Sequence, residues 1–450
     1  MESKKWLIGM ALIIGLCFLS VPVFSGGGQE AEKIEIRCYW WGDGEAPGMA
    51  GWMKESTELY QQQNPNITVE APEIPIEDLF TTWKAELAAG TPPDIQLFGR
   101  QQGMDGSEAG NILPVDEYWS EEELAHISPP ARRELTWSGH TWLVPLYGGA
   151  WLTVLNPKIY REAGLNPENT PQQWNDFVGA LEKMKSAGFT PFSCGFKDGY
   201  MGVWWASLVG IQNLDDMSDL HEAVMGVQHF TDPKHSNFWY RIEELIDKGL
   251  FNEDAASVGF AEGNDKFLNE KVGMVFAVQS MVNGYIKELG EDSVSVMISP
   301  TPPNPGKLAG RMPFYTMPLG IAKLSKHPET AADFLRFLHT EERIAAMYRQ
   351  SGAIQASDKV SLDIMTSADK LMAEWVVEVP NYTYNEHYVP QIESEVWASA
   401  QLLSIGDISA AEAAQRYEDA AAKWRREFPE ALERFKRIAA EWKRDADKYK

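Results

Sequence analysis

Cysteine is scarce in this chain, which contains only three among 450 residues. Cys17 lies in the hydrophobic N-terminal run, while Cys38 and Cys194 are isolated and far apart in the sequence. Their separation excludes a CxxC metal or redox motif. A disulfide between Cys38 and Cys194 is permitted if the chain works in an oxidising compartment.

Positive charge is also in short supply. The chain has 40 Lys and Arg against 65 Asp and Glu, which gives a formal net charge of -25. Binding to nucleic acid depends on Lys and Arg at the phosphates, so the composition excludes nucleic acid as a partner. It disfavours an anionic small ligand less strongly. The simplest interpretation of the acidity is that it keeps the protein soluble.

The usual sequence patterns of enzymes are missing. The sequence has no G-x-S-x-G, no H-E-x-x-H and no P-loop. Its eight histidines are scattered; His229 and His235 are close, but Asp232-Pro233 between them predicts a turn and not a metal site. We therefore expect no enzyme and no cofactor. A secreted glycoside hydrolase is the alternative, because such enzymes need only two suitably spaced carboxylates.

Long apolar runs are absent except near the N-terminus. Lys4 and Lys5 precede an uncharged run over 6–24, and the small residue Ser25 follows. This is the pattern of an export signal, so we expect a signal peptide over 1–25 and a spacer over 26–33. Lipidation of Cys17, or retention of the run as a membrane anchor, are alternatives. All three place the body of the protein outside the cytoplasm, in the periplasm or the extracellular space.

Tryptophan, in contrast, is abundant, with 17 copies. Some of these side chains must be core. The surplus is of interest because flat aromatic faces suit ligands that present C–H surfaces, such as sugars.

Strand-like and helix-like segments alternate along the chain. The residue patterns predict strands over 34–41, 67–69, 95–98, 143–156, 272–278 and 319–323. They predict helices over 52–63, 77–89, 171–185, 238–248, 330–349, 391–403, 409–425 and 429–450, the last packed by one face. Thr170-Pro171 is expected to open the helix over 171–185. This alternation predicts an α/β fold with a mostly parallel sheet covered by helices.

Six short motifs follow one another in a characteristic order. They are Tyr60…Asn64-Pro65…Ile67-Thr68-Val69; 87–95, LAAGTPPDI; 139–145, GHTWLVP, with 155–160, LNPKIY; 171–177, PQQWNDF, with 188–191, GFTP; 267–274, FLNEKVGM; and 325–335, SKHPETAADFL. In this combination the chain resembles the extracellular solute-binding proteins of family 1, the group that includes maltose-binding protein. The resemblance runs from about residue 34 to residue 425.

The resemblance implies an α/β, two-lobed periplasmic-binding-protein fold, similar to type II, with a ligand cleft between the lobes. Hinge crossings are expected near 145–150, 312–318 and 360–375. Lobe one would comprise 34–147 plus 316–365, lobe two 150–312 plus 375–425, and 426–450 would be a C-terminal helix. Because Cys38 and Cys194 then fall in different lobes, we expect two free, buried thiols.

The resemblance also implies a function. The chain would be the substrate-binding subunit of a bacterial ABC importer, a monomer that captures a carbohydrate by hinge closure. It would deliver this ligand to permease subunits in the inner membrane. A non-sugar solute, such as a polyol phosphate or a peptide, is an alternative. A role as a sensor partner is another.

Candidate ligand contacts lie first at strand ends, where open α/β sheets bind ligands. The loop after the first strand provides Trp41 and Asp43. The end of the strand at 95–98 provides Phe98 and Gln101, and the family has a ligand-contacting aromatic at the position that matches Phe98. The first crossing provides Tyr147.

The resemblance adds Asp198, Tyr200 and Trp204, which match the place where maltose-type members carry an acidic residue and two aromatics. It also adds Trp397, which lies near another aromatic of the family. Carboxylates accept paired sugar hydroxyls through charge-assisted hydrogen bonds. The sequence departs from the family at 279–281, where QSM replaces a common G-x-W, and at 315–316, where YT replaces paired glycines. We therefore add two further candidates, Gln279 and Tyr315.

Packing is the competing interpretation for these residues. Asp43 and Asp198 suit turn capping as well as ligand binding. Four other tryptophans sit where a core role is expected: Trp83, Trp174, Trp205 and Trp239.

Overall fold

The structure is a computed structural model that describes residues 33–43, 46–269, 271–378, 380–382 and 389–445. The predicted signal peptide, spacer and Cys17 lie outside the described residues. Within them, no helix is both long and apolar enough to cross a lipid bilayer.

One sheet runs through the molecule in the order β2-β1-β3-β11-β7-β9-β8. Its strands are β2 (Ile67–Glu70), β1 (Ile34–Tyr39), β3 (Ile95–Leu97), β11 (Met312–Ala322), β7 (Val144–Leu155), β9 (Val272–Val278) and β8 (Thr190–Ser193). The outer pairs are parallel, as predicted, but β3-β11, β11-β7 and β7-β9 are antiparallel. The expectation of a mostly parallel sheet is therefore wrong in the middle, where two long strands run against their neighbours.

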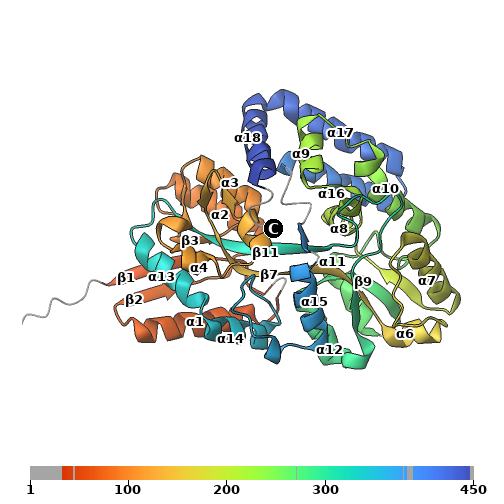
Figure 1. Cartoon of the computed structure of the whole chain (residues 1–450), viewed down its shortest axis with the longest axis horizontal. Coiled ribbons are helices and arrows are strands. Elements are labelled where there is room, and N and C mark those ends of the chain that lie inside the picture. The colour runs from red at the N-terminus through yellow and green to blue at the C-terminus, as the bar shows by residue number, and fades with distance from the viewer. Residues whose placement is uncertain (1–32, 44–45, 270, 379, 383–388, 446–450) are drawn as a thin grey trace, which may run out of the picture.

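The two long strands join two halves of the molecule (Figure 1). We call the part around β1, β2 and β3 the β1 half; it includes α1 (Met49–Gln63), α2 (Ile76–Ala88), α3 (Arg100–Glu108), α5 (Pro129–Glu134), α13 (Pro328–Leu338) and α14 (Glu341–Ser351). We call the part around β8 and β9 the β9 half; it includes α7 (Trp174–Ser186), α8 (Met201–Leu208), α9 (Ser218–Met225), α10 (Pro233–Asp247), α11 (Phe260–Asp265) and α12 (Gln279–Leu289).

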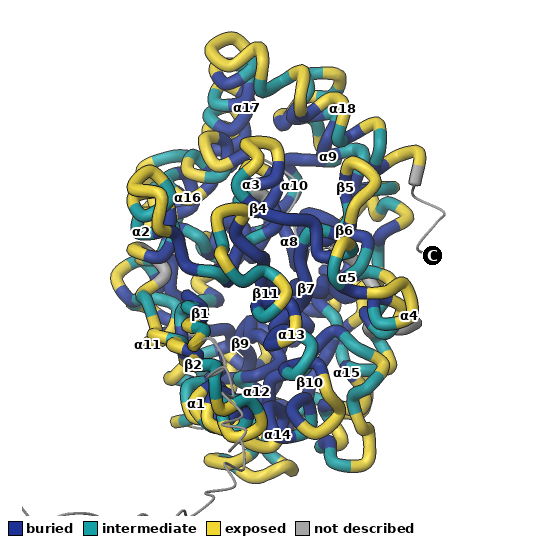
Figure 2. The backbone as a smooth tube through the Cα atoms, turned by 90° about the vertical axis from the view of Figure 1, so that its left-hand side faces the viewer, coloured by how far each residue is buried: buried dark blue, intermediate teal, exposed yellow. Residues whose placement is uncertain are grey.

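Strands β7 and β11 are buried along their whole length (Figure 2). Residues 144–145 of β7 face β11 beside the β1 half, whereas 151–155 pair with β9. A Cβ atom at Gly148 would overlap the backbone oxygen of Tyr315, so glycine permits the close approach of the two strands at their centre. β11 begins at Met312 and not near 319 as predicted, because the expected crossing segment is itself strand.

Three predicted helix boundaries differ for identifiable reasons. Trp174 and not Pro171 opens α7, because residues 172–174 bond instead to the backbone of Thr301. Asp232 closes a turn, as predicted, because its backbone N–H donates to the His229 oxygen at 2.9 Å; α10 then begins at Pro233, ahead of the predicted start at 238. The helix predicted over 330–349 is two helices, since α13 ends before His339 and α14 begins after Thr340.

The C-terminal helices match their predictions closely. They are α16 (Pro390–Ser404), α17 (Ala410–Glu427) and α18 (Pro429–Asp445). Ser409 and Glu412 form a capping box that starts α17. The core roles expected for four tryptophans are confirmed by their exposure: Trp83 5%, Trp174 1%, Trp205 0% and Trp239 0%.

Both thiols of the described chain are free and buried, as predicted. Cys38 lies on β1 and Cys194 follows β8, so the two are in different halves. Burial raises the pKa of both thiols to about 12. They are therefore poor nucleophiles in the folded protein.

Candidate functional site

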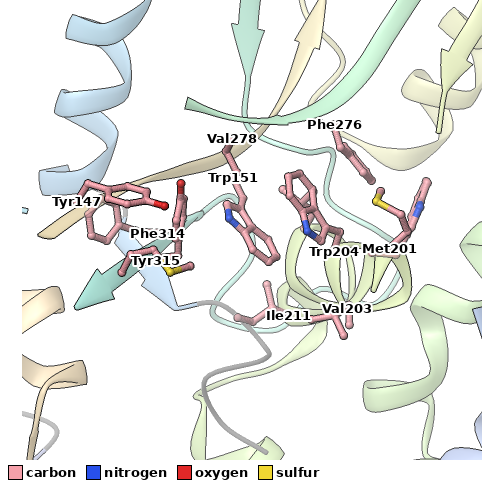
Figure 3. Close-up of a cluster of buried hydrophobic side chains, with 14 of the residues drawn as sticks. Tyr147, Trp151, Met201, Val203, Trp204, Ile211, Phe276, Val278, Phe314 and Tyr315 are labelled. Atoms are coloured by element: carbon pink, nitrogen blue, oxygen red, sulfur yellow. The ribbon is translucent and has the colours of Figure 1, made fainter. Parts of the chain in front are cut away.

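Four aromatic side chains meet where β7 and β11 pass close to α8 (Figure 3). We call this group, Tyr147, Trp151, Trp204 and Tyr315, the crossing cluster. Trp151 stacks on Trp204 with ring centroids 4.5 Å apart and an interplanar angle of 16°. Tyr315 of β11 lies 6.0 Å from Trp151 and 6.5 Å from Tyr147. The cluster therefore joins both long strands to a helix of the β9 half.

Trp41 connects this cluster to the β1 half. Its indole Nε1 donates a hydrogen bond to Tyr147 Oη at 2.7 Å. Trp41 follows β1, at the carboxyl end of a strand, as the sequence analysis expected. The structure thus brings together four predicted residues, Trp41, Tyr147, Trp204 and Tyr315.

Trp151 was not predicted, although it lies four residues after Tyr147 on the same strand. Alternate residues of a strand share a face, so Tyr147, Gly149 and Trp151 point the same way. Gly149 has no side chain to separate the two rings. Counting every second residue from Tyr147 along the predicted strand leads to Trp151, so the sequence did contain a signal for it.

A second aromatic group continues from Trp204. Phe260, which begins α11, lies 4.7 Å from Trp204 and 6.0 Å from Tyr200 by ring centroids. Tyr200 in turn lies 6.0 Å from Trp397 of α16, whose side chain is 41% exposed. A Cβ at Gly199 would come within 2.7 Å of the Trp397 carbonyl oxygen, so glycine lets α16 approach this loop. Phe260 is the second residue that the sequence analysis missed.

Asp198 lies beside this second group. Its Oδ2 accepts a hydrogen bond from the backbone N–H of Phe260 at 2.7 Å and another from Tyr200 Oη at 3.4 Å. The carboxylate therefore fixes the start of α11 against the loop before α8. The side chains of the crossing cluster and of the second aromatic group are all uncharged. Asp198 adds one carboxylate beside them.

Three predicted contacts are engaged elsewhere in this structure. Asp43 is exposed and its Oδ1 accepts a hydrogen bond from the backbone N–H of Ala50 at 2.6 Å, in the first turn of α1. Phe98 is 1% exposed and packs edge-on against Trp83, with centroids 5.3 Å apart. Gln279 is buried and its Nε2 donates to Asp369 Oδ1 at 3.0 Å. Their roles as ligand contacts stay predictions.

Gln101 is the second residue of α3, and its side chain is outside what the structure describes. Across the described ranges, no group of three His, Cys, Asp or Glu side chains is placed to hold a metal ion. The site is thus an aromatic one in its chemistry. It offers stacking faces, phenol and indole hydrogen-bonding groups and a single carboxylate.

Comparison with known proteins identifies the family. The family model for bacterial extracellular solute-binding proteins matches residues 42–343. A putative binding protein of Brucella abortus is 22% identical over 295 residues, which is 64% of this chain and 66%, just under two thirds, of that relative. The multiple sugar-binding protein of Streptococcus mutans is 22% identical over 367 residues, covering 78% of this chain and 82% of the relative.

A solved chitin oligosaccharide binding protein has the same fold. It superimposes with a TM-score of 0.77 at 19% identity, covering 86% of this chain and 98% of that one. At this identity the likeness shows the two-lobed fold. Together with the family match, it shows that the chain belongs to the bacterial extracellular solute-binding proteins.

Proposed function

We propose that this protein captures a carbohydrate outside the cytoplasm and delivers it to the permease of a bacterial ABC importer. The names of similar proteins support this, because the Streptococcus mutans relative is a multiple sugar-binding protein and the structural neighbour binds chitin oligosaccharide. The chemistry of the site supports it independently. Aromatic faces with few charges suit a neutral ligand that carries both C–H surfaces and hydroxyls.

The observation that carries the proposal is the indole N–H of Trp151. Trp151 is 5% exposed, and its Nε1 finds no acceptor among the described residues. Buried indole N–H groups usually have a hydrogen-bond partner, because an unpaired one costs free energy. We infer that the missing acceptor is a hydroxyl of the solute.

Stacking of Trp151 on Trp204 leaves no space for a sugar ring between them. Trp151 and Trp204 are also each only 5% exposed, so a solute reaches the crossing cluster only after the two halves have moved apart. Strands β7 and β11 are the elements that link the halves and absorb the rotation. A solute shifts the population toward the closed form if it contacts both halves there.

In this proposal lobe one comprises 34–147 plus 316–365 and lobe two 150–312 plus 375–425. The contacts belong to Trp41, Tyr147, Trp151, Asp198, Tyr200, Trp204, Tyr315 and Trp397. No covalent step is required, so no residue is given a catalytic role. The protein acts as an exported monomer with its signal peptide over 1–25 removed.

The test is a thermal-shift screen of residues 26–450 against mono- and oligosaccharides, with polyol phosphates and peptides as controls. A solute at 100 times its dissociation constant adds about 2.7 kcal/mol to the free energy of unfolding. A higher melting temperature with one class of sugar, recovered intact, is the expected result. Stabilisation by a control solute alone would overturn the sugar assignment. Consumption of the sugar would support the glycoside hydrolase alternative.

A further inference from the structure

Helix α18 lies across both halves of the molecule. In Figure 1 it stands over the gap between α3 of the β1 half and α9 of the β9 half. Figures 1 and 2 both place it on the side of β7 and β11 where α17 lies, and Figure 1 places α8 and α16 there too. This is the side of the crossing cluster. The helix therefore stands over the region where the proposed solute would be enclosed.

The contacts of α18 with the β1 half are polar and closely fitted. Arg434 Nε lies 2.7 Å from Glu108 Oε2 of α3. Glu441 Oε2 accepts a hydrogen bond from the backbone N–H of Ser138 at 2.8 Å. The two residues are about two turns apart on α18, so the helix is held at more than one point.

Trp442 is the residue through which α18 contacts both halves at once. Arg133 Cζ of α5 lies 3.9 Å from its ring centroid, and Arg100 Cζ of α3 lies 5.4 Å away. The ring of His221, from α9 of the β9 half, lies 5.9 Å away. Trp442 is 5% exposed and both arginines are buried, and cation–π attraction is strongest in such desolvated surroundings.

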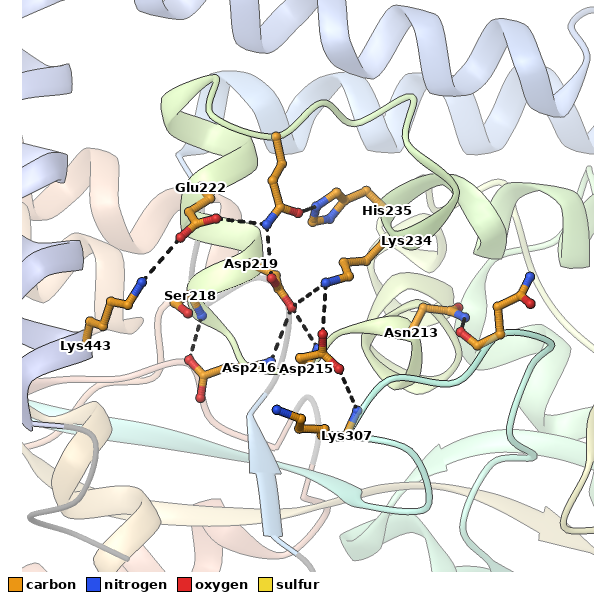
Figure 4. A network of polar contacts seen from close by, with 12 residues as sticks. Asn213, Asp215, Asp216, Ser218, Asp219, Glu222, Lys234, His235, Lys307 and Lys443 are labelled. Carbon is orange, nitrogen blue, oxygen red and sulfur yellow. Dashed lines mark hydrogen bonds and ion pairs between the residues drawn. The ribbon is translucent and has the colours of Figure 1, made fainter.

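Helix α18 contacts the β9 half through α9, which is itself linked to α10. Lys443 Nζ lies 3.4 Å from Glu222 of α9, and Gln228 Nε2 donates to Glu222 at 2.9 Å and to Asp219 at 3.0 Å (Figure 4). Asp219 also pairs with Lys234 of α10 at 3.2 Å. Helix α9 is therefore linked to α10 through Asp219. The contact between Lys443 and Glu222 thus ties α18 to the body of the β9 half and not to an isolated helix.

We propose that α18 is a strap that holds the two halves closed, and that opening requires it to release the β1 half. A rotation about β7 and β11 that opens this side separates α5 from α9, so contacts at one end of α18 must break. Only Phe428 separates α18 from α17, which packs on α10 of the β9 half. The contacts to Glu108, Ser138 and Arg133 are thus the ones that break.

The test measures the separation of the halves in the solute-free protein. Spin labels are placed at Lys84→Cys on α2 and Lys183→Cys on α7, both exposed, while the buried native thiols stay unlabelled. Distances are measured by double electron–electron resonance. Deletion of 429–450, or Trp442→Ala, is expected to raise the ratio of long to short distances at least about fivefold.

Lys436→Ala is the matched control. Lys436 is on the same helix and exposed, and it pairs with Glu433 of α18 itself, so the distance distribution should not change. An unchanged distribution in a folded deletion variant overturns the proposal. If the deletion or Trp442→Ala prevents folding, the surface variant Arg434→Glu decides in their place.

Arg434→Glu is expected to lengthen the distances, and adding Glu108→Arg is expected to restore them. A native distribution in Arg434→Glu would refute the strap. The inference depends on movement of the two halves but not on the identity of the solute. The resonance measurement therefore succeeds or fails separately from the sugar screen.

Discussion

Trp151 of β7 stacks on Trp204 of α8 at a centroid distance of 4.5 Å, so a strand shared by both halves is fixed to a helix of one of them. The two residues differ in what they offer. Trp204 also contacts Phe260, with ring centroids 4.7 Å apart, and offers the solute a flat aromatic surface for stacking. Trp151 in addition provides a donor that has no acceptor within the part of the chain described here. Substitutions can separate these contributions.

Replacing Trp151 by Phe retains a stacking ring but removes the N–H. We expect the dissociation constant for the sugar found by the screen to rise roughly fivefold, since a neutral hydrogen bond contributes about 1 kcal/mol. Calorimetric titration measures this. Trp83→Phe, which alters a buried tryptophan of the β1 half away from the crossing cluster, is the control and should bind normally. Equal affinity of Trp151→Phe and the native protein would remove the proposed solute hydrogen bond.

Replacing Trp204 by Ala removes the stacking face. Binding should weaken by at least about 1–2 kcal/mol, by analogy with buried aromatic contacts elsewhere. Because Trp204 is also core, the melting temperature should fall as well. Trp239→Ala truncates another buried tryptophan of the β9 half and should reduce stability alone. If both variants bind the sugar as tightly as the native protein does, Trp204 is a packing residue only.

The two thiols give a test of the lobe assignment that needs no solute. Protein comprising 26–450, denatured without reductant, should show two reactive thiols, Cys38 and Cys194. The folded protein should react slowly at pH 8, because burial raises the pKa of both to about 12. A thiol-reactive dye measures both states. Finding none after denaturation would mean a disulfide and a wrong assignment of the lobes.

His339 predicts a dependence of stability on pH. Burial lowers its pKa to about 4, and its Nδ1 lies 2.7 Å from the backbone oxygen of Leu335. The unfolded chain, with a pKa near 6.5, binds the proton more readily than the folded protein between these values. The contribution of neutral His339 is therefore complete above about pH 6.5 and is lost as the pH falls toward about 4.

Urea unfolding of His339→Gln against the native protein measures this contribution. The advantage of the native protein should shrink by up to about 3 kcal/mol across that range. A difference between His339→Gln and the native protein that does not vary with pH would show that the ring does not titrate in this way.

The fold could be predicted largely from local patterns, because most helices and strands carry their own period and end signals. The break between α13 and α14 could not, since residues 339–340 contain neither glycine nor proline. Nor could the true start of α7, which depends on a backbone pairing with Thr301, far away in the sequence. Such a pairing forms only when distant parts of the chain come together, so the local sequence around 171–174 gives no sign of it.

The site was only partly accessible to the same reasoning. Trp41 and Tyr147 follow from strand ends and the expected crossing. Trp151 was missed because β7 is apolar along nearly its whole length, so no alternation of apolar and polar residues marks the face that Trp151 shares with Tyr147. For α18, packing by one face was predicted and is confirmed by its buried Phe435, Ala439 and Trp442. Its neighbours in both halves could be known only from the structure.

Gly148 is a position at which the hinge of a biosensor built on this protein could be adjusted. The backbone of β11 occupies the space that a side chain there would need, so an alanine would act as a wedge between the two strands that join the halves. It would change the resting angle of the hinge without replacing any proposed solute-contacting side chain. Signal amplitude and ligand preference in a biosensor built on this protein could thus be set at different positions.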